Sequence, residues 1–321
     1  FTLTTRMNNG QDLYIGLMSG TSSDAIDAAL VQFSDSGWEL LSTLAATLDA
    51  SIVDRIQHAV DGTADRINDI SELDALLAQA FADTALRLKA QARVDQITAI
   101  GSHGQTVRHR PGGCLPYTVQ LGSGSRIAAL TGITTVSDFR TADLALGGQG
   151  APLVPAFHRA VFSNPDENRV IVNIGGIANA TVLHRKDRLS GFDTGPGNTL
   201  MDHWFRQHQP GAYDENGTWA RSGKYLPKLL SALLEHDYFS RPLPKSTGLE
   251  EFNLDWLGTC LIGNERPEDV QATLVELTVE SISHSIKTNV PATDAVYLCG
   301  GGANNDYLVN QLDNRLTPLP L

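Results

Sequence analysis

A turn of small residues between two apolar runs constrains the fold of this chain most. The first apolar run starts at Tyr14 and enters Gly20, residues 21–24 are small or acidic, and a second apolar run extends from Ile26 to Val31. This pattern predicts a strand, a tight polar turn and a returning strand. Gly20 can take backbone angles closed to other residues. Hydroxyl and backbone N–H groups at the tip would form a concavity suited to phosphate oxygens. A hairpin tip without a ligand has the same pattern, so spacing alone leaves both interpretations open.

The same arrangement recurs in the second half of the chain. Residues 169–183 again predict a strand, a turn at Gly175 and Gly176, and a second strand. Each hairpin is followed by alternating helix and strand patterns, and 321 residues exceed what one ordinary core accommodates. The sequence therefore predicts an α/β protein with a duplicated plan. We place the domains at 1–146 and 147–321, divided by the glycine-rich segment 147–152, with a cleft between them.

Three further patterns predict local structure near candidate sites. Helical spacing extends to about residue 94, and Ser71 with Asp74 resembles a capping box at its start. Residues 97–100 predict a short buried strand that opens into a polar loop at 101–106, the kind of place where open α/β sheets bind ligands. A buried strand at 295–299 leads into three glycines at 300–302.

Charge and cysteine content exclude several classes of partner. The chain has 24 Lys and Arg against 36 Asp and Glu, a net charge of −12. This acidic balance without a basic run argues against nucleic acid and against an anionic membrane surface. No apolar run reaches membrane-spanning length, and the opening residues do not form a signal peptide. An odd number of distant cysteines, Cys114, Cys260 and Cys299, fits the reduced thiols of a cytoplasmic protein.

An ordered set of motifs resembles the 1,6-anhydro-N-acetylmuramic acid kinase family, which belongs to the superfamily of actin, Hsp70 and the sugar kinases. Any single glycine-rich block would be weak evidence, but the set keeps the family's order and spans nearly the whole chain. The motifs are residues 16–22 with Asp24 and Asp27, 101–106, 138–140 with Asp143, 147–153, 173–179, 192–198 and 300–302. The resemblance implies a duplicated two-domain actin-like ATPase fold, of the ribonuclease H-like type, with the active site in the cleft between the domains.

The resemblance also implies the reaction and the residues that carry it out. It implies ATP, Mg²⁺, a bicyclic amino sugar whose O6 is tied to C1, and a homodimer that acts in peptidoglycan recycling. Phosphate contacts are expected from both hairpins and adenosine contacts from the last glycines, and Asp24 and Asp27 could hold the metal. The expected nucleotide and metal residues are Gly20, Thr21, Ser22, Ser23, Asp24, Asp27, Asn173, Gly175, Gly176, Gly300, Gly301 and Gly302. A plain type I′ or II′ hairpin explains Gly175 and Gly176 equally well, and a strand-to-helix turn could explain residues 300–302.

Asp193 is the expected general base. It stands at the start of a Gly-Pro-Gly turn, which could hold its carboxylate rigidly to activate water in the manner of an inverting glycosidase. Capping of the following turn or helix is the structural alternative.

Contacts to the sugar are expected from His103, Gln105, Arg140 and Asp143. Arg140 could hold the lactyl carboxylate of muramic acid as a fork. It could equally form an ion pair with Asp143, and a lone histidine such as His103 is more often structural.

The chain departs from the family pattern in two places. Ala25 stands where the family usually has glycine, so the phosphate loop would be strained if that position needs a positive φ. The family also extends several dozen residues past the position of Leu321. These features leave open a nucleotide-gated sugar-binding protein of the same fold without turnover. A kinase acting on another sugar is a third possibility.

Overall fold

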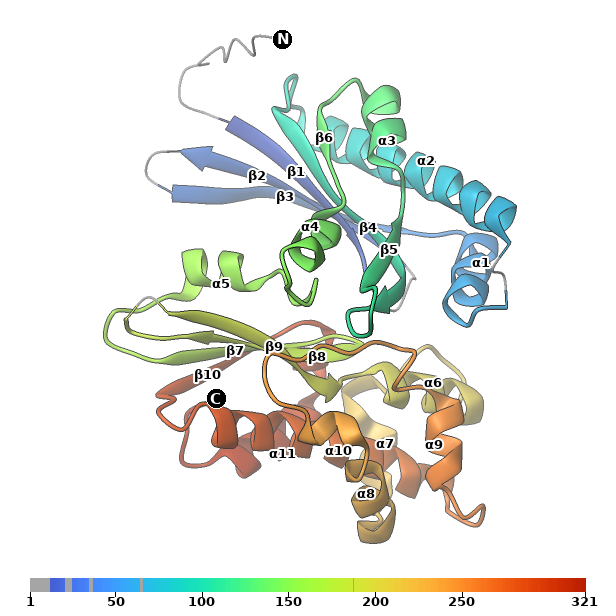
Figure 1. Ribbon diagram of the computed structural model, residues 1–321, viewed down its shortest axis with the longest axis vertical. Coiled ribbons are helices and arrows are strands. Elements are labelled where there is room, and N and C mark those ends of the chain that lie inside the picture. Colours follow the sequence, from blue (N-terminus) through green and yellow to red (C-terminus); the bar gives the residue numbers. More distant parts are fainter. Residues whose placement is uncertain (1–11, 21–24, 35–36, 64–65, 187) are drawn as a thin grey trace. The chain divides into compact units, whose positions relative to one another are not determined.

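The computed structural model describes residues 12–20, 25–34, 37–63, 66–186 and 188–321 (Figure 1). The chain divides into two compact units, Phe1–Leu146, here called unit 1, and Gly147–Leu321, here called unit 2. Each unit contains one sheet and its own hydrophobic core.

Unit 1 is built on a mixed sheet with the strand order β3-β2-β1-β4-β5, and β6 pairs with β4. The first three strands form an antiparallel meander, whereas β4 runs parallel to β1. The strands are β1 Asp12–Ser19, β2 Ala25–Ser34, β3 Gly37–Thr47, β4 Ala99–Arg110, β5 Tyr117–Leu121 and β6 Thr135–Val136.

Helices cover one face of this sheet (Figure 1). The helices of unit 1 are α1 Ala50–Val60, α2 Ile67–Ala92, α3 Gly124–Thr131 and α4 Phe139–Ala145. Phe81 and Leu77 of α2 pack in the same core as Ile15 and Ile100 of the sheet. Because successive side chains of a strand point to opposite faces, Met18 of β1 lies on the other face, where it is exposed.

Two predictions of local structure in unit 1 are wrong. Helix α2 begins at Ile67 rather than Ser71, and the Ser71 hydroxyl donates to the Ile67 carbonyl inside the helix. The Asp74 carboxylate accepts from the Gly122 backbone N–H at 2.8 Å, so it does not form a capping box.

The predicted loop at 101–106 belongs instead to strand β4. Gly101 pairs with Gly16 and Gln105 with Ser19. The parallel ladder with β1 therefore carries the strand through its polar residues. The register shifts between Leu17 and Ser19, near Gly104, which has a φ of +74°.

Unit 2 repeats the topology of unit 1. Its sheet has the order β10-β7-β8-β9, in which β7, β8 and β9 are antiparallel neighbours and β10 runs parallel to β7. In both units, the fourth strand thus returns beside the first, on the side away from the meander. This repeated order confirms the duplicated α/β fold. The strands are β7 Arg169–Ile174, β8 Ile177–Leu183, β9 Leu189–Pro196 and β10 Ala295–Cys299.

Helix α10 forms the centre of unit 2. Its side chains Leu274, Leu277 and Ile282 are buried in one core with Val172 and Phe192 of the sheet. In the described part of the chain, no helix has the length and apolar character needed to cross a membrane. The helices are α5 Pro155–Phe162, α6 Thr199–His208, α7 Thr218–Ser222, α8 Pro227–Leu234, α9 Leu254–Cys260, α10 Pro267–Asn289 and α11 Asp306–Leu316. The 3₁₀ turns are η1 Glu215–Gly217, η2 Asp237–Ser240 and η3 Gly301–Asn304.

Candidate active site

A hollow of about 520 Å³ lies in unit 1, lined by residues of β1, β2, β3, β4 and α4. Most of its lining is apolar or glycine, and Phe139 contributes an aromatic ring. The carboxylate of Asp27 and the imidazole of His103 are its ionisable groups. A mostly apolar hollow with a few polar groups is typical of a small-molecule site.

Arg140 and His103 are joined at this hollow. The Arg140 Nε donates to His103 Nε2 at 3.0 Å, and His103 Nδ1 lies 2.9 Å from the Gly104 carbonyl oxygen. Nδ1 therefore carries the proton and Nε2 accepts. Burial and, secondarily, the charge of Arg140 lower the pKa of His103, which keeps the ring neutral. A neutral His103 fixes the orientation of the Arg140 guanidinium. Asp143 lies on the same helix, α4.

Gln105 supports the ends of the first hairpin turn. Its side chain is 1% exposed, accepts from the Ser19 hydroxyl at 2.6 Å and donates to the Gly20 carbonyl at 3.3 Å. The Ser19 hydroxyl also lies 3.2 Å from the Ala25 carbonyl oxygen. Both ends of the turn are thus tied to β4, and a contact between Gln105 and the sugar stays a prediction.

Ala25 is not strained. It is the first residue of β2, pairs with Thr47, and does not have a positive φ. The expected strain at this position is therefore wrong, because the residue is already in the extended ladder. Gly20 likewise lacks a left-handed φ. The tip residues Thr21, Ser22, Ser23 and Asp24 lie outside the described residues.

The expected metal pair is only partly described. Asp27 is exposed in β2. Within the described ranges, no three His, Cys, Asp or Glu residues gather to hold a metal ion. Since Asp24 falls outside those ranges, the pair stays a prediction.

Three glycine segments of unit 2 converge at the end of β7. The Gly175 carbonyl accepts from the Asn198 N–H at 2.8 Å, and the Gly176 carbonyl accepts from the Gly197 N–H at 2.9 Å. Neither Gly175 nor Gly176 has a left-handed φ, so the hairpin is not of type I′ or II′. The turn instead packs against the start of α6.

The segment 300–302 also needs glycine. Gly300 has a φ of +82°, and a Cβ added there would lie 2.7 Å from both the Asn173 Oδ1 and the Ile174 carbonyl oxygen. A Cβ on Gly302 would overlap the side chain of Ile174. Gly301 begins η3, so these glycines do form the turn between β10 and a helical element. They let the backbone of one strand end approach another closely.

A row of polar side chains crosses the sheet of unit 2. Asn173 of β7 is directly opposite Asn179 of β8, which is opposite Asp193 of β9. Cys299 of β10 pairs with Asn173, and their Sγ and Oδ1 atoms are 3.8 Å apart. Opposite residues of adjacent strands share one face. The row therefore leads from the glycine segments to Asp193.

Asn179 was missed as a site residue by sequence reasoning. Its Oδ1 is shielded from solvent and lacks a hydrogen-bond partner in the described part of the chain. A polar atom left in this way is uncommon in folded proteins and calls for an explanation such as a bound ligand or water. The signal that could have identified it is the hairpin register, since Asn173 and Asn179 flank the turn symmetrically.

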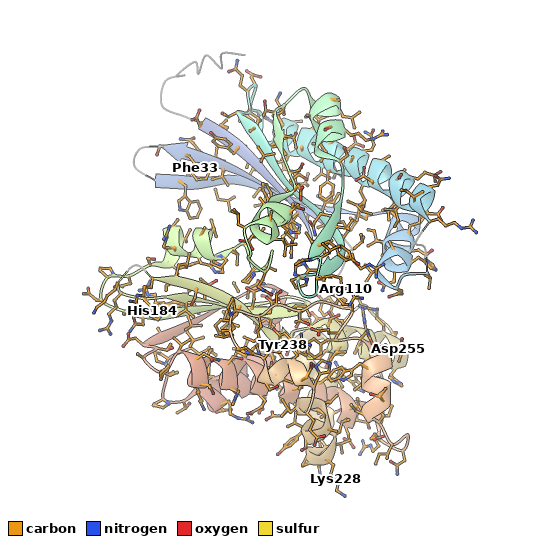
Figure 2. All side chains as sticks on the ribbon, viewed as in Figure 1. Phe33, Arg110, His184, Lys228, Tyr238 and Asp255 are labelled. Carbon is orange, nitrogen blue, oxygen red and sulfur yellow. The ribbon has the colours of Figure 1, made fainter. Side chains whose placement is uncertain are left out.

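Asp193 lies within strand β9 rather than at the start of a turn. The expectation of a turn is wrong because the β8–β9 ladder continues to Pro196. Its side chain is 4% exposed, and its Oδ2 accepts from the Thr247 backbone N–H at 3.0 Å. Its own N–H donates to the Lys245 carbonyl, and its carbonyl accepts from the Tyr238 hydroxyl at 2.7 Å. Tyr238, labelled in Figure 2, is buried inside unit 2.

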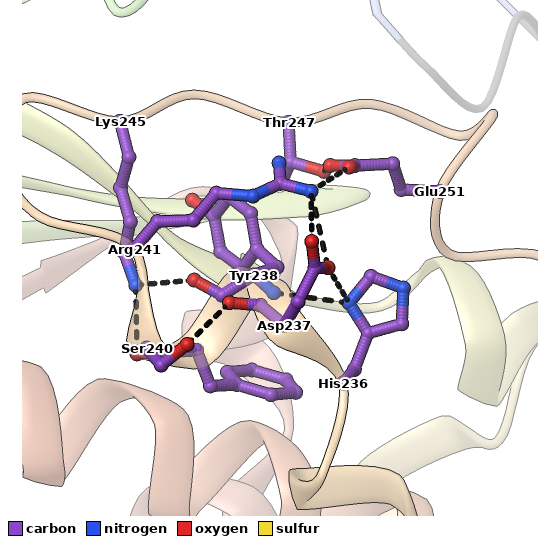
Figure 3. A network of polar contacts seen from close by, with 9 residues as sticks. His236, Asp237, Tyr238, Ser240, Arg241, Lys245, Thr247 and Glu251 are labelled. Carbon is purple, nitrogen blue, oxygen red and sulfur yellow. Dashed lines mark hydrogen bonds and ion pairs between the residues drawn. The ribbon is translucent and has the colours of Figure 1, made fainter.

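Figure 3 shows the polar network that surrounds this support. The buried Lys245 Nζ donates to the Tyr238 and Phe239 carbonyls at 2.9 and 3.2 Å and lies 4.4 Å from the centre of the Tyr238 ring. Burial, and then the charge of Arg241, lower the pKa of Lys245. Arg241 pairs with Glu251 at 2.6 Å. Sequence reasoning missed these residues, and no local pattern marks them as partners of Asp193.

Two α/β units of the same topology, with glycine turns and a buried carboxylate at strand ends, define the class: a two-domain protein of the actin-like type. A family model described as anhydro-N-acetylmuramic acid kinase matches residues 12–320. The chain belongs to this family and is a carbohydrate kinase.

Curated relatives agree with this assignment. The anhydro-N-acetylmuramic acid kinase of Coxiella burnetii (strain Dugway 5J108-111) is 48% identical over 314 residues, covering 96% of this chain and 84% of the relative. The enzyme of that name from Aliivibrio fischeri (strain ATCC 700601 / ES114) is 46% identical over 307 residues, covering 94% and 84%.

Solved structures with a similar fold are more distant in sequence. A PilM–PilN type IV pilus biogenesis complex matches with a TM-score of 0.48 and 13% identity, covering 94% of this chain and 85% of that chain. A ROK family glucokinase from Streptomyces griseus, in complex with glucose and AMPPNP, matches with a TM-score of 0.41 and 11% identity, covering 94% and 88%.

Proposed function

We propose that this chain opens 1,6-anhydro-N-acetylmuramic acid with water and phosphorylates the released O6 from ATP, as a step of peptidoglycan recycling. The C1–O6 bond breaks, O6 forms a bond to the γ-phosphorus, and ADP leaves. The water oxygen bonds to C1 and its proton passes to Asp193. The products are ADP and N-acetylmuramic acid 6-phosphate, so every atom of sugar, water and ATP is accounted for.

The polar row of unit 2 is the observation that carries this proposal. It connects a glycine-lined backbone segment, where a side chain at Gly300 would collide, with a buried carboxylate. Between the two lies the unpartnered amide oxygen of Asn179. This arrangement suits a ligand that approaches backbone at one end and reacts beside a carboxylate at the other.

We assign the remaining roles on the same basis. Asn173, Gly175, Gly176 and residues 300–302 would contact the nucleotide, together with residues 20–24 of unit 1. Asp27 with Asp24 would hold Mg²⁺, which neutralises charge on the transferring phosphoryl group. In unit 1, His103 would orient the Arg140 guanidinium toward the sugar carboxylate. Gln105 and Asp143 complete the proposed sugar contacts.

The base assignment predicts the behaviour of Asp193→Asn. The amide cannot accept the water proton, so turnover should fall by roughly 10²–10⁴ while binding of an ATP analogue is retained. Steady-state kinetics and calorimetric titration check this, with Asp255→Asn on the surface of α9 as the matched control. Near-normal turnover in Asp193→Asn would remove the residue from the mechanism.

A coupled ADP-release assay with the anhydro sugar tests the reaction itself. The product should gain the elements of both phosphate and water, as determined by mass spectrometry. Glucosamine-type hexoses serve as competing substrates for the kinase of another sugar. The alternative of a binding protein without turnover is not favoured, since the family is one of kinases and Ala25 is not strained.

Assembly and location are also proposals. We expect a homodimer in the cytoplasm, as the family resemblance implies. Light scattering should give twice the 34.6 kDa of one chain, and a mass of one chain would contradict the dimer.

A further inference from the structure

We propose that Thr247 is a positioning residue for catalysis, acting through Asp193 and held by Glu251. The inference rests on the proposed role of Asp193 as general base. It concerns residues 245–251, here called the 245–251 loop, to which the sequence assigns no role.

The loop runs beside strand β9 where Asp193 lies. Asp193 and Thr247 are 54 positions apart, yet the Thr247 N–H donates to the Asp193 Oδ2 at 3.0 Å in a buried setting. Two residues earlier in the loop, the Lys245 carbonyl accepts from the Asp193 N–H at 3.0 Å. The loop therefore contacts both the backbone and the carboxylate of the proposed base.

The loop is itself held at both ends. The Thr247 hydroxyl donates to the Glu251 Oε2 at 2.5 Å, and the Glu251 Oε1 lies 2.6 Å from the Arg241 guanidinium. Arg241 also binds Asp237 through two contacts of 3.1 and 3.2 Å (Figure 3). At the other end, the Lys245 Nζ donates to two carbonyls of η2. Pairing at both ends fixes the direction of the Thr247 N–H.

The loop also reaches the glycine-rich segment at the start of unit 2. The Ser246 hydroxyl lies 3.4 Å from the Gln149 Oε1. Thr247 thus connects the carboxylate of Asp193 to a supported framework rather than to a freely moving loop.

This geometry has two chemical consequences. A general base must be held in register with the water that it deprotonates, and small misplacements cost large factors in rate. A hydrogen bond donated to a carboxylate also favours its ionised form, the form that accepts a proton. Loss of the Thr247 hydroxyl would release the N–H that provides both effects.

The experiment uses Thr247→Val, which keeps the shape of the side chain and the backbone N–H but removes the anchor to Glu251. We expect kcat to fall about 10- to 100-fold, with the affinity for an ATP analogue unchanged within about 2-fold. The acid limb of the pH profile of kcat should move to higher pH, because the carboxylate loses support for its charge. Thr247→Ser restores the hydroxyl and should restore both quantities.

Matched variants separate this role from a structural one. Thr259→Val removes a hydroxyl that binds only within its own helix region, 2.7 Å from the Trp256 carbonyl oxygen, and should change neither kcat nor the pH profile. In an Asp193→Asn background, Thr247→Val should cause no further loss of turnover. A wild-type kcat in Thr247→Val, an unmoved acid limb, or a full additional loss in the Asp193→Asn background would each overturn the inference.

The outcomes also distinguish this inference from the proposed function. If Asp193→Asn lowers turnover and Thr247→Val does not, only the positioning role fails. If Asp193→Asn turns over normally, the base assignment fails and the positioning role fails with it.

Discussion

At the scale of single residues, buried histidines in unit 1 determine the charge near the hollow. Burial and the nearby Arg140 lower the pKa of His109 from 6.5 to about 4 and also lower that of His103. Both rings are therefore neutral at pH 7, and the guanidinium keeps its charge. The Arg140 side chain can then offer a fixed cation to an anionic group of the sugar.

This environment predicts a loss of stability in acid. The unfolded chain protonates His109 below pH 6.5, whereas the folded protein does not until about pH 4, so stability present above 6.5 is lost as pH falls through this window. Between pH 7 and pH 5, the wild type should lose about 1–2 kcal/mol more than His109→Gln. Urea titrations followed by circular dichroism measure the difference. The exposed His184→Gln is the control, and equal losses in wild type and His109→Gln would contradict a buried neutral ring.

At the scale of elements, the turn between β10 and η3 depends on glycine for two separate reasons. Gly300 has a φ of +82°, which is costly for any residue with a Cβ, and an added Cβ would also approach two oxygen atoms to 2.7 Å. The turn therefore brings the backbone against Asn173 and Ile174 at the end of β7.

Gly300→Ala should disturb both the fold and the nucleotide contact. We expect a loss of about 1–3 kcal/mol in the free energy of unfolding of unit 2 and weaker binding of a non-hydrolysable ATP analogue. Urea unfolding and calorimetric titration measure the two effects. Gly258→Ala, in α9 with open space around an added Cβ, should be neutral or slightly stabilising. Unchanged analogue binding in Gly300→Ala would argue against an adenosine role for the turn.

At the scale of the whole molecule, the two hydrophobic cores share no residue. One core is formed within unit 1 around α2, and the other within unit 2 around α10. Mutations in separate cores are expected to act independently.

Leu77→Ala should therefore destabilise unit 1 alone, by about 2–5 kcal/mol, because it leaves a cavity in a fully buried site. Hydrogen exchange followed by mass spectrometry should show faster exchange in the peptides of α2 and β4. Leu274→Ala is the reciprocal variant and should accelerate exchange in unit 2. Equal acceleration in both units by either variant would mean that the two cores unfold as one.

Much of the fold follows from local patterns, and the failures have a common cause. Apolar runs, glycine turns and helical spacing indicated the meanders and the main helices. The sequence failed at residues 101–106 and at Asp193, where polar residues were interpreted as a loop and a turn. Their backbone is held in a ladder by a neighbouring strand, and the ladder continues regardless of side-chain polarity.

The candidate site was predictable only where its residues belong to motifs. Asp193, Asn173 and the glycines were identified from motif order, and the structure brings these residues together in unit 2. Thr247 and Tyr238 could not be found in this way, because they meet Asp193 across 54 and 45 positions of the chain. Asn179 required the register of the β7–β8 hairpin.

The sequence by itself determined the order of the motifs, and with it the family, the reaction class and the duplicated plan, because these depend on residue identity and spacing along the chain. Only the tertiary structure decided which backbone N–H meets the Asp193 carboxylate, which amide oxygen lacks a partner, and that Ala25 fits its strand. Those features depend on strand register and on contacts between distant segments, and neither is encoded in any local pattern of residues.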